Sequence, residues 1–223
     1  MKRNNFQFEA DFKKSIKLDE LTMQLLLKKS YLATCSIMRG TNDTLIHGSG
    51  FFCKIPLKGK IIKFLFTNNH VLDKDSIKEG EIIKCSYKNK LKKFEIKKRR
   101  CFTNADLDYT CIEILNEDQI EDFFEIENKN LYNSNYEVIA LPKYPDGGGS
   151  LEIYSGYLTE INDYQIYHYV STSKGSAGSP IILILRDFKI LGIHSGKQII
   201  GHKEQNRGIL MTKILSDIEK VKR

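Results

Sequence analysis

The 223-residue sequence contains no long hydrophobic run. A membrane-spanning helix needs roughly 18 or more consecutive apolar residues, and no segment approaches that length. The opening MKRNNFQFEADFKKSIKLDE is charged throughout and lacks the apolar stretch of a secretory signal. We therefore expect a cytoplasmic protein that does not use a membrane.

Metal-binding and disulfide patterns are also missing. The five cysteines are an odd number, show no CxxC spacing and mostly fall in apolar segments such as FFCKI and YTCIEI, which predicts reduced, buried thiols. His47, His168 and His202 have no matching ligand spacing around them. The glycines at 147–149 are not followed by the Lys-Ser/Thr of a phosphate-binding loop. We expect no metal and no cofactor.

The charge balance is basic, with a formal net charge of +7 and a pI near 9.0. Such a chain can attract nucleic acid, an acidic membrane surface or an acidic polypeptide. In the densest basic run, 88–100, the apolar Leu91, Phe94 and Ile96 alternate with charged residues as in an exposed strand. Because no groove-reading helix or row of aromatic residues accompanies it, we expect a solvated hairpin and not a nucleic-acid site. The positive charge could instead steer the protein to an acidic partner protein.

The two ends of the chain have helical spacing. Phe12, Ile16, Leu21 and Leu25 predict a helix within 11–30, and 212–222 predicts another. Between them the sequence is a series of short strand-like segments separated by turn signals such as GTND and YPDGGGS. Many short strands without alternating helices indicate antiparallel barrels or sandwiches. The candidate strands are 31–38, 48–56, 60–67, 81–87, 92–97, 109–115, 136–142, 151–160, 164–171, 180–186, 188–195 and 207–212.

The acidic segment 116–130 is poor in strand signal and is the best place to divide the chain. We expect an N-terminal helical extension over 1–30, a first β unit over 31–125, and a second β unit with the C-terminal helix over 126–223. No sequence repeat relates the two halves.

Three motifs bear on chemistry, and the first two carry a histidine and a carboxylate. In FLFTNNHVL a strand is predicted to end at Thr67, which places His70 just after the strand end. An imidazole held there can act as a general base, or it can be an ordinary surface residue. In NADLDYTCIEIL either Asp106 or Asp108 could orient a histidine. We favour Asp108, because YTCIEI then keeps its strand alternation, and Asp106 then serves as a turn residue.

The third motif is STSKGSAGSP, in which Gly175 and Gly178 bracket position 177. A Gly-x-nucleophile-Gly frame lets backbone N–H groups converge on one oxyanion. Histidine, then aspartate, then this framed position is the chain order of the triad in chymotrypsin-type barrels.

The motifs TNNHV, DYTCIEI, GSAGSP, ILGIHSG and NRGILM, taken in this order, resemble those of the trypsin/chymotrypsin-like serine proteases. The glutamyl-endopeptidase branch is the most similar, because it typically shows T-N-x-H-V, G-x-S-G-S-P and G-I-H-x-G together with a Y-P-x-G loop like YPDG here. The resemblance covers about 31–218. It implies an all-β fold of two antiparallel six-stranded β-barrels, with the N-terminal and C-terminal helices as additions.

The resemblance also implies a role for each matching residue. His70 matches the general base, Asp108 its orienting carboxylate, and Ala177 the position of the nucleophilic serine. The N–H groups of Gly175 and Ala177 match the oxyanion hole. Two further pairs match the substrate-binding residues: Thr172 and His194 line the S1 pocket, and Ser195 and Gly196 form the wall along which an extended peptide pairs.

A hydroxyl beside an imidazole can hydrogen-bond a carboxylate or a carboxamide, so the implied cleavage site follows Glu or Gln. Viral 3C-type cysteine proteases have the same Thr and His pairing and prefer Gln. The expected activity is therefore limited proteolysis of an extended protein or peptide substrate.

Ala177 removes the nucleophile, so the chain as given should be catalytically inactive. Ser176 and Ser179 lie outside the glycine frame and should not replace it. Two explanations remain: an engineered Ser→Ala change, which we favour because the other motif residues are intact, or a natural pseudoprotease that binds peptides or partners.

The departures from secreted trypsins concern activation. No Ile-Val-Gly-Gly start is present, and Ser176 stands where an aspartate would pair with a freed N-terminus. If activity is regulated, a partner protein or the N-terminal helix is the expected means.

Overall fold

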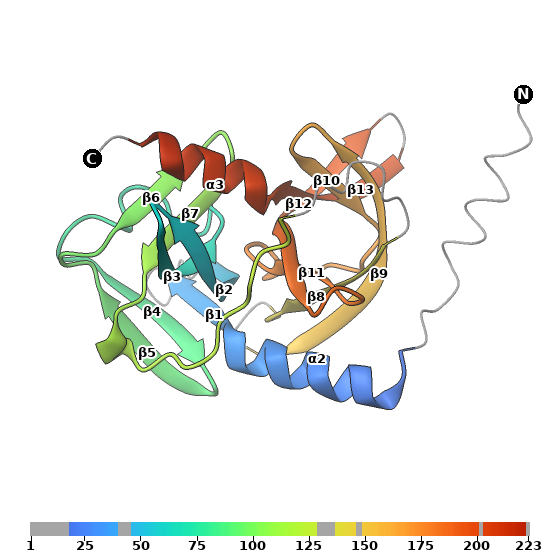
Figure 1. The fold of residues 1–223 in the computed structure, drawn as a ribbon, viewed down its shortest axis with the longest axis horizontal. Coiled ribbons are helices and arrows are strands. Elements are labelled where there is room, and N and C mark those ends of the chain that lie inside the picture. The colour runs from blue at the N-terminus through green and yellow to red at the C-terminus, as the bar shows by residue number, and fades with distance from the viewer. Residues whose placement is uncertain (1–17, 40–45, 129–136, 146–148, 201–202, 222–223) are drawn as a thin grey trace, which may run out of the picture.

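The computed structural model describes residues 18–39, 46–128, 137–145, 149–200 and 203–221. Two β-sheets lie side by side, with α2 along one edge of the molecule and α3 across the opposite edge (Figure 1). The elements are α2 (Glu20–Ala33), β1 (Thr34–Arg39), β2 (Ile46–Leu57), β3 (Lys60–Thr67), β4 (Ile82–Tyr87), β5 (Lys90–Glu95), β6 (Cys101–Asn104), β7 (Tyr109–Glu113), β8 (Val138–Lys143), β9 (Glu152–Asn162), β10 (Gln165–His168), β11 (Pro180–Leu183), β12 (Lys189–Ile200), β13 (Lys203–Leu210) and α3 (Met211–Lys220).

Helix α2 begins later and ends later than its sequence pattern predicts. Asp19 caps its start, because the carboxylate accepts hydrogen bonds from the Thr22 N–H at 2.9 Å and the Thr22 hydroxyl at 2.6 Å. The expected strand start at Tyr31 is wrong: the helix continues to Ala33, whose burial in the core outweighs the local strand propensity. The expected first turns of the helix, 11–17, lie outside the described residues.

The first sheet is antiparallel and has seven strands in the order β5-β4-β1-β2-β3-β7-β6. The resemblance implies six strands, and the additional strand is β6, which the sequence pattern does not predict. Its four residues are too few to show alternation, and they form a strand because they pair with β7 from Cys101↔Ile112 to Asn104↔Tyr109.

The second sheet is a closed barrel of six strands in the order β10-β13-β12-β11-β8-β9, as the resemblance implies. Strand β12 extends to Ile200, five residues beyond the predicted strand end at Ser195. A register shift between His194 and Gly196 makes Ser195 the extra residue of a β-bulge. The predicted strand 207–212 begins earlier, at Lys203, and Met211 opens α3 instead of continuing the strand.

The chain passes from the first sheet to the second between Phe124 and Ile126. Phe124 bridges to Cys53 of β2, and Ile126 bridges to Ile190 of β12. The largest cluster of buried apolar residues includes side chains of both sheets and both helices, among them Leu26 and Ile214. The interface between the sheets is therefore a continuous hydrophobic core.

Helix α3 also joins the two halves. It follows β13 directly, and its Asp217 carboxylate accepts hydrogen bonds from Asn104 at 3.0 Å and from the Tyr109 hydroxyl at 2.7 Å in the first sheet. Burial and this contact raise the pKa of Tyr109 well above its usual value. The last helix of the second half is thus anchored on the first.

Candidate active site

His70 and Asp108 meet at one end of the first sheet. His70 follows β3, and Asp108 precedes β7, which pairs with β3 through Thr67↔Thr110. Both carboxylate oxygens lie 2.9 Å from His70 Nδ1, and the His70 N–H donates to Oδ1 at 3.1 Å. Because a carboxylate only accepts, Nδ1 carries the hydrogen and Nε2 is left as the basic nitrogen.

The backbone holds Asp108 in an unusual conformation. Its φ is 49°, in the left-handed region, and its carbonyl accepts a 2.8 Å hydrogen bond from the Asn68 side chain. Asn68 is fully buried, and its Nδ2 also lies 3.4 Å from Ser195 Oγ in the second sheet. Asp106, the alternative carboxylate, is exposed in the preceding turn, where its N–H bonds the Asn104 side chain.

The glycine-framed loop of the second sheet is held by Ser49 of β2. The Ser49 N–H donates to the Ala177 carbonyl at 2.7 Å, and its hydroxyl donates to the Gly175 carbonyl at 2.8 Å. On the same strand, a Cβ on Gly48 would lie 2.7 Å from the Val71 methyl groups and 3.3 Å from the Ala177 oxygen. Val71, which follows His70, and Ala177 therefore both lie against Gly48 of β2.

Both glycines of the frame have positive φ, 86° at Gly175 and 84° at Gly178. At Gly178 a side chain is impossible without movement, since a Cβ would lie 2.1 Å from the Ser49 oxygen and 2.4 Å from Thr67 Oγ1. Within the described residues, the N–H groups of Gly175 and Ala177 make no hydrogen bond. These are the two donors that a negatively charged oxygen could use.

The serines on either side of the framed position point into the protein. Ser176 is buried, and its hydroxyl accepts a 3.0 Å hydrogen bond from the Ser173 N–H, while its own N–H donates to the Ser173 carbonyl. Ser179 is fully buried, with its N–H on the Ser176 carbonyl. Neither hydroxyl is on the exposed side of the loop.

A pair of buried imidazoles lies beside the loop. His168 Nδ1 accepts a 3.2 Å hydrogen bond from the Val170 N–H, so the hydrogen of the neutral ring is on Nε2, which lies 3.2 Å from His194 Nδ1. His194 consequently keeps its hydrogen on Nε2. Burial lowers the pKa of His168 to about 3. Burial and, after it, the neighbouring His168 lower the pKa of His194 well below its usual value, so both rings are neutral at pH 7.

Thr172, Ser195 and Gly196 lie in the two segments that flank this pair. The Thr172 hydroxyl donates to Asn206 Oδ1 at 2.7 Å, and Asn206 in turn donates to the Val170 carbonyl at 2.7 Å. Ser195 is the buried bulge residue of β12, and Gly196 has a φ of 131° and an uncovered backbone, since a Cβ added there would meet no atom within 4 Å. Thr172 and His194 are thus linked through Asn206, Val170 and His168.

A buried lysine supports the same loop. Lys143, at the end of β8, donates to Ser173 Oγ at 2.8 Å and lies 4.3 Å from the Tyr154 ring centre and 3.7 Å from the Glu152 carboxylate. Its side chain is 3% exposed, so this positive charge is largely removed from water. A fixed cation here favours anionic groups near His194.

Four residues of the site are not predicted by the sequence: Ser49, Asn68, Lys143 and His168. Asn68 lies within the motif TNNHV, and that motif is a signal by which it could be found. The other three act through contacts between distant strands, which no local pattern reveals. His168 is visible in the sequence only as a histidine without ligand spacing.

The described residues contain no group of three or more His, Cys, Asp or Glu side chains able to hold a metal ion. None of the five cysteines, all of them in the described residues, forms a disulfide, and all but the partly buried Cys101 are buried. No helix in the described part of the chain is long and apolar enough to cross a membrane. His47 lies in β2, away from other ligands, and His202 is outside the described residues.

The sequence matches no protein-family model, and no curated protein is detectably similar to it. Solved structures are informative about the fold. The serine endoprotease of Yersinia pestis superimposes with a TM-score of 0.68 at 14% identity, covering 92% of this chain and 67% of the other. The active form of the Rv3671c protease of M. tuberculosis gives 0.67 at 13% identity, covering 92% and 88%. A serine-to-alanine mutant of Rv3671c in an inactive form gives 0.63 at 12% identity, covering 94% and 99%.

These matches identify the fold of the chain as that of the chymotrypsin-like serine proteases. The class is all-β with a short helix at each end of the described chain, as the sequence predicts.

Proposed function

We propose that this chain is the inactive form of a serine endopeptidase that cuts an extended polypeptide after Glu or Gln. In the active enzyme a serine at position 177 attacks the peptide carbonyl, and His70 Nε2 takes its proton and later returns it to the leaving amine. Asp108 holds the His70 ring in the required tautomer. The N–H groups of Gly175 and of residue 177 stabilise the developing oxyanion.

The observation that carries this proposal is the contact of both Asp108 carboxylate oxygens with His70 Nδ1, next to a glycine-framed loop. Its geometry leaves Nε2 as the free base. The loop supplies two unengaged N–H donors within the described residues. A histidine with a carboxylate partner occurs in many roles, but the addition of such donors favours acyl transfer.

The proposed P1 preference depends on His194 and Thr172, which lie in the same network beside the loop. An imidazole next to a hydroxyl is the pairing proposed to recognise the side-chain oxygen of a Glu or Gln. The neutral imidazole suits a carboxamide, whereas the buried charge of Lys143 suits a carboxylate. The proposed specificity therefore includes both Glu and Gln at P1.

The proposed cause of inactivity is the missing hydroxyl of Ala177. Ser176 and Ser179 are buried, and the Ser176 hydroxyl is engaged with the Ser173 N–H, so neither replaces it. Because the rest of the arrangement is intact, we propose that Ala177 is an engineered replacement of a serine. The second candidate is a naturally inactive protein that holds an extended peptide or a regulatory partner along Ser195 and Gly196.

The test is the Ala177→Ser variant, assayed against peptides that differ only at P1. We expect cleavage after Glu or Gln, none in the original chain, and loss of at least about 10³-fold when His70→Ala is added. Circular dichroism and urea unfolding check that each variant is folded. A folded Ala177→Ser protein that binds these peptides without cutting them would support the second candidate and refute the first.

A further inference from the structure

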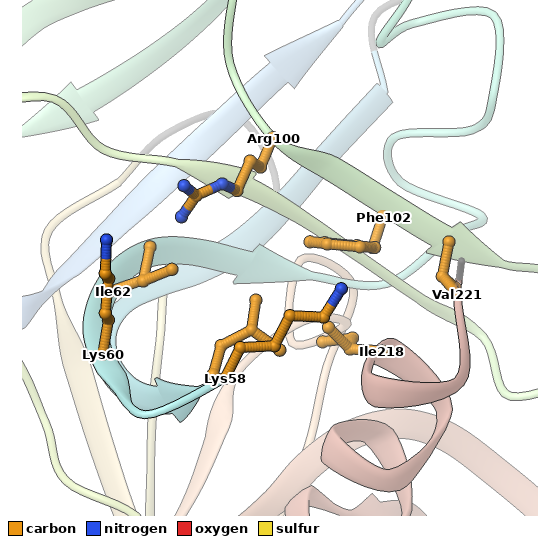
Figure 2. A pocket seen from close by; sticks show the side chains of 8 residues that line it. Lys58, Lys60, Ile62, Arg100, Phe102, Ile218 and Val221 are labelled. Carbon is orange, nitrogen blue, oxygen red and sulfur yellow. The ribbon is translucent and has the colours of Figure 1, made fainter. Parts of the chain in front are cut away.

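A cavity lies on the first sheet, at the opposite end of β3 from His70. It encloses about 310 Å³ and is lined by the β2–β3 hairpin, the start of β6 and the end of α3 (Figure 2). The hairpin turn at Lys58 and Gly59 has positive φ at both residues, which folds β3 back along β2. Strand β3 then leads from Lys60 to Thr67, roughly 24 Å at 3.4 Å per residue, before His70 is reached.

The floor of this cavity is apolar. Phe102 and Leu57 are each 6% exposed, and Ile218 is 1% exposed. Ile62 and Val221 form its sides, and Val221 is still 43% exposed. The accessible apolar surface of the cavity is therefore mainly that of Ile62 and Val221, above a buried floor. Concave apolar surface of this kind is a common feature of binding sites.

The rim of the cavity carries three cations. Figure 2 shows Arg100 and Lys60 beside Ile62, whereas the Lys58 amine extends toward Phe102 and Val221. Among the described residues, no carboxylate pairs with Lys58 or Lys60, and Arg100 lies 3.6 Å from Glu113. The positive charge around the floor is therefore only partly balanced.

We propose that this cavity is a docking site for an acidic peptide segment that carries one large apolar anchor residue. The anchor side chain would pack between Ile62 and Val221, above the buried floor, and its acidic neighbours would meet the cations on the two sides. The volume is at the small end of ligand pockets, which suits a single side chain. Cations on both sides suit carboxylates flanking an anchor better than they suit the single headgroup of a fatty acid.

This docking site does not depend on the proposed activity. Its lysines belong to the β2–β3 hairpin, at the other end of β3 from His70, and neither His70 nor Asp108 lines the cavity. A protein that is recognised through such a segment could be a substrate held at a second point or a regulatory partner.

The site can be tested with the full Ala177 chain and the fluorescein-labelled peptide GDDFDDG. Aspartate is used because Glu or Gln would engage the proposed P1 site. We expect anisotropy titrations to show saturable binding that weakens at least about tenfold in Lys58→Glu/Lys60→Glu, where like charges replace attraction. Val221→Asp should weaken it similarly, because it adds a negative charge at the apolar side.

The matched control is Lys84→Glu/Lys93→Glu. These two lysines are cross-strand neighbours on β4 and β5, outside the cavity, and the substitution changes the net charge equally. We expect affinity within about threefold of the original protein. Near-ultraviolet circular dichroism verifies that all variants keep their tertiary structure, which positions open to solvent should allow.

Three results would overturn the proposal. An equal loss of peptide affinity in the two double variants would mean that net charge alone attracts the peptide. Equal affinity for GDDGDDG would mean that the apolar floor binds no anchor. Absence of peptide binding, with sodium laurate bound by the original chain but not by Val221→Asp, would identify the cavity as a fatty-acid site.

Discussion

The Asn68 side-chain amide donates a 2.8 Å hydrogen bond to the Asp108 backbone carbonyl, which fixes the carboxylate that faces His70. Asn68→Asp, made together with Ala177→Ser, replaces this donor with an acceptor. We expect kcat to fall about 10²-fold with little change in KM, since a misplacement of about 1 Å has this effect.

The neighbouring Asn69→Asp is the control for this prediction. Asn69 Nδ2 bonds Thr103 Oγ1 at 2.7 Å, a contact that does not involve Asp108, and Asn69→Asp adds the same charge. Activity should stay within about threefold. Equal losses in the two variants would show that added charge, and not the Asp108 contact, is responsible.

Gly178→Ala should be strongly destabilising, because its Cβ would collide with the Ser49 carbonyl at 2.1 Å and its φ is 84°. Gly59→Ala is the matched comparison: its φ is 75°, but no atom lies within 4 Å of the added Cβ. We expect a loss of about 1 kcal/mol in the free energy of unfolding at Gly59, from backbone strain alone, and above about 3 kcal/mol at Gly178. Urea unfolding measures both, and similar losses would contradict the packing around Gly178.

The stability of the protein should fall as the pH drops below about 6.5. In the folded protein the pKa values of His168 and His194 are lower than in the unfolded chain, so the unfolded state binds more protons. The stability that is present above pH 6.5 is therefore lost as the pH falls toward the pKa of the folded state, which is about 3 for His168. Each ring contributes up to about 1.4 kcal/mol per pH unit in this window.

Urea unfolding between pH 7.5 and pH 4.5 tests this dependence. Although desolvation acts in the opposite direction, hydrogen bonds from Ser76 and Arg39 lower the pKa of Asp73 to about 2, so its stabilising effect is lost only below about pH 4. His168→Gln should flatten the pH dependence by about one proton. An unchanged slope in His168→Gln would contradict the role of the buried pair.

The ratio of cleavage after Glu to cleavage after Gln should rise as the pH is lowered from about 8 to about 5.5 in the Ala177→Ser protein. A Glu carboxylate bound beside His194 favours the protonated ring, whereas an uncharged Gln carboxamide does not. The measurement is kcat/KM for two peptides that differ only at P1. A ratio independent of pH would mean that Lys143 alone neutralises the carboxylate.

Much of the architecture can be predicted because strand alternation is local. The sequence predicts 60–67 to the residue and 81–87 to within one residue, since buried and exposed side chains alternate along the latter as Ile83, Cys85 and Tyr87 turn inward. The end of α2 is not predictable, because Ala33 is helical on account of the core around it. Cys101–Asn104 is a strand only because β7 lies beside it.

The candidate site divides in the same way. His70, Asp108 and the glycine frame are visible because each lies within a short motif next to a strand end. The contact of His168 with His194 joins β10 to β12, which are separated by β13 in the barrel, so it depends on the spatial order of strands that are distant in the sequence. Lys143 and Ser49 reach the loop from other strands, and their spacing in the sequence carries no such information.

Ser49 makes the geometry of the loop sensitive to the docking of the two sheets. It is a first-sheet residue whose N–H and hydroxyl hold the Ala177 and Gly175 carbonyls, while its hydroxyl also accepts the Tyr144 N–H at 3.0 Å. The loop therefore keeps its shape only while the sheets are in register. Any partner that shifted one sheet against the other would displace the Gly175 and Ala177 N–H groups without touching the His70–Asp108 pair.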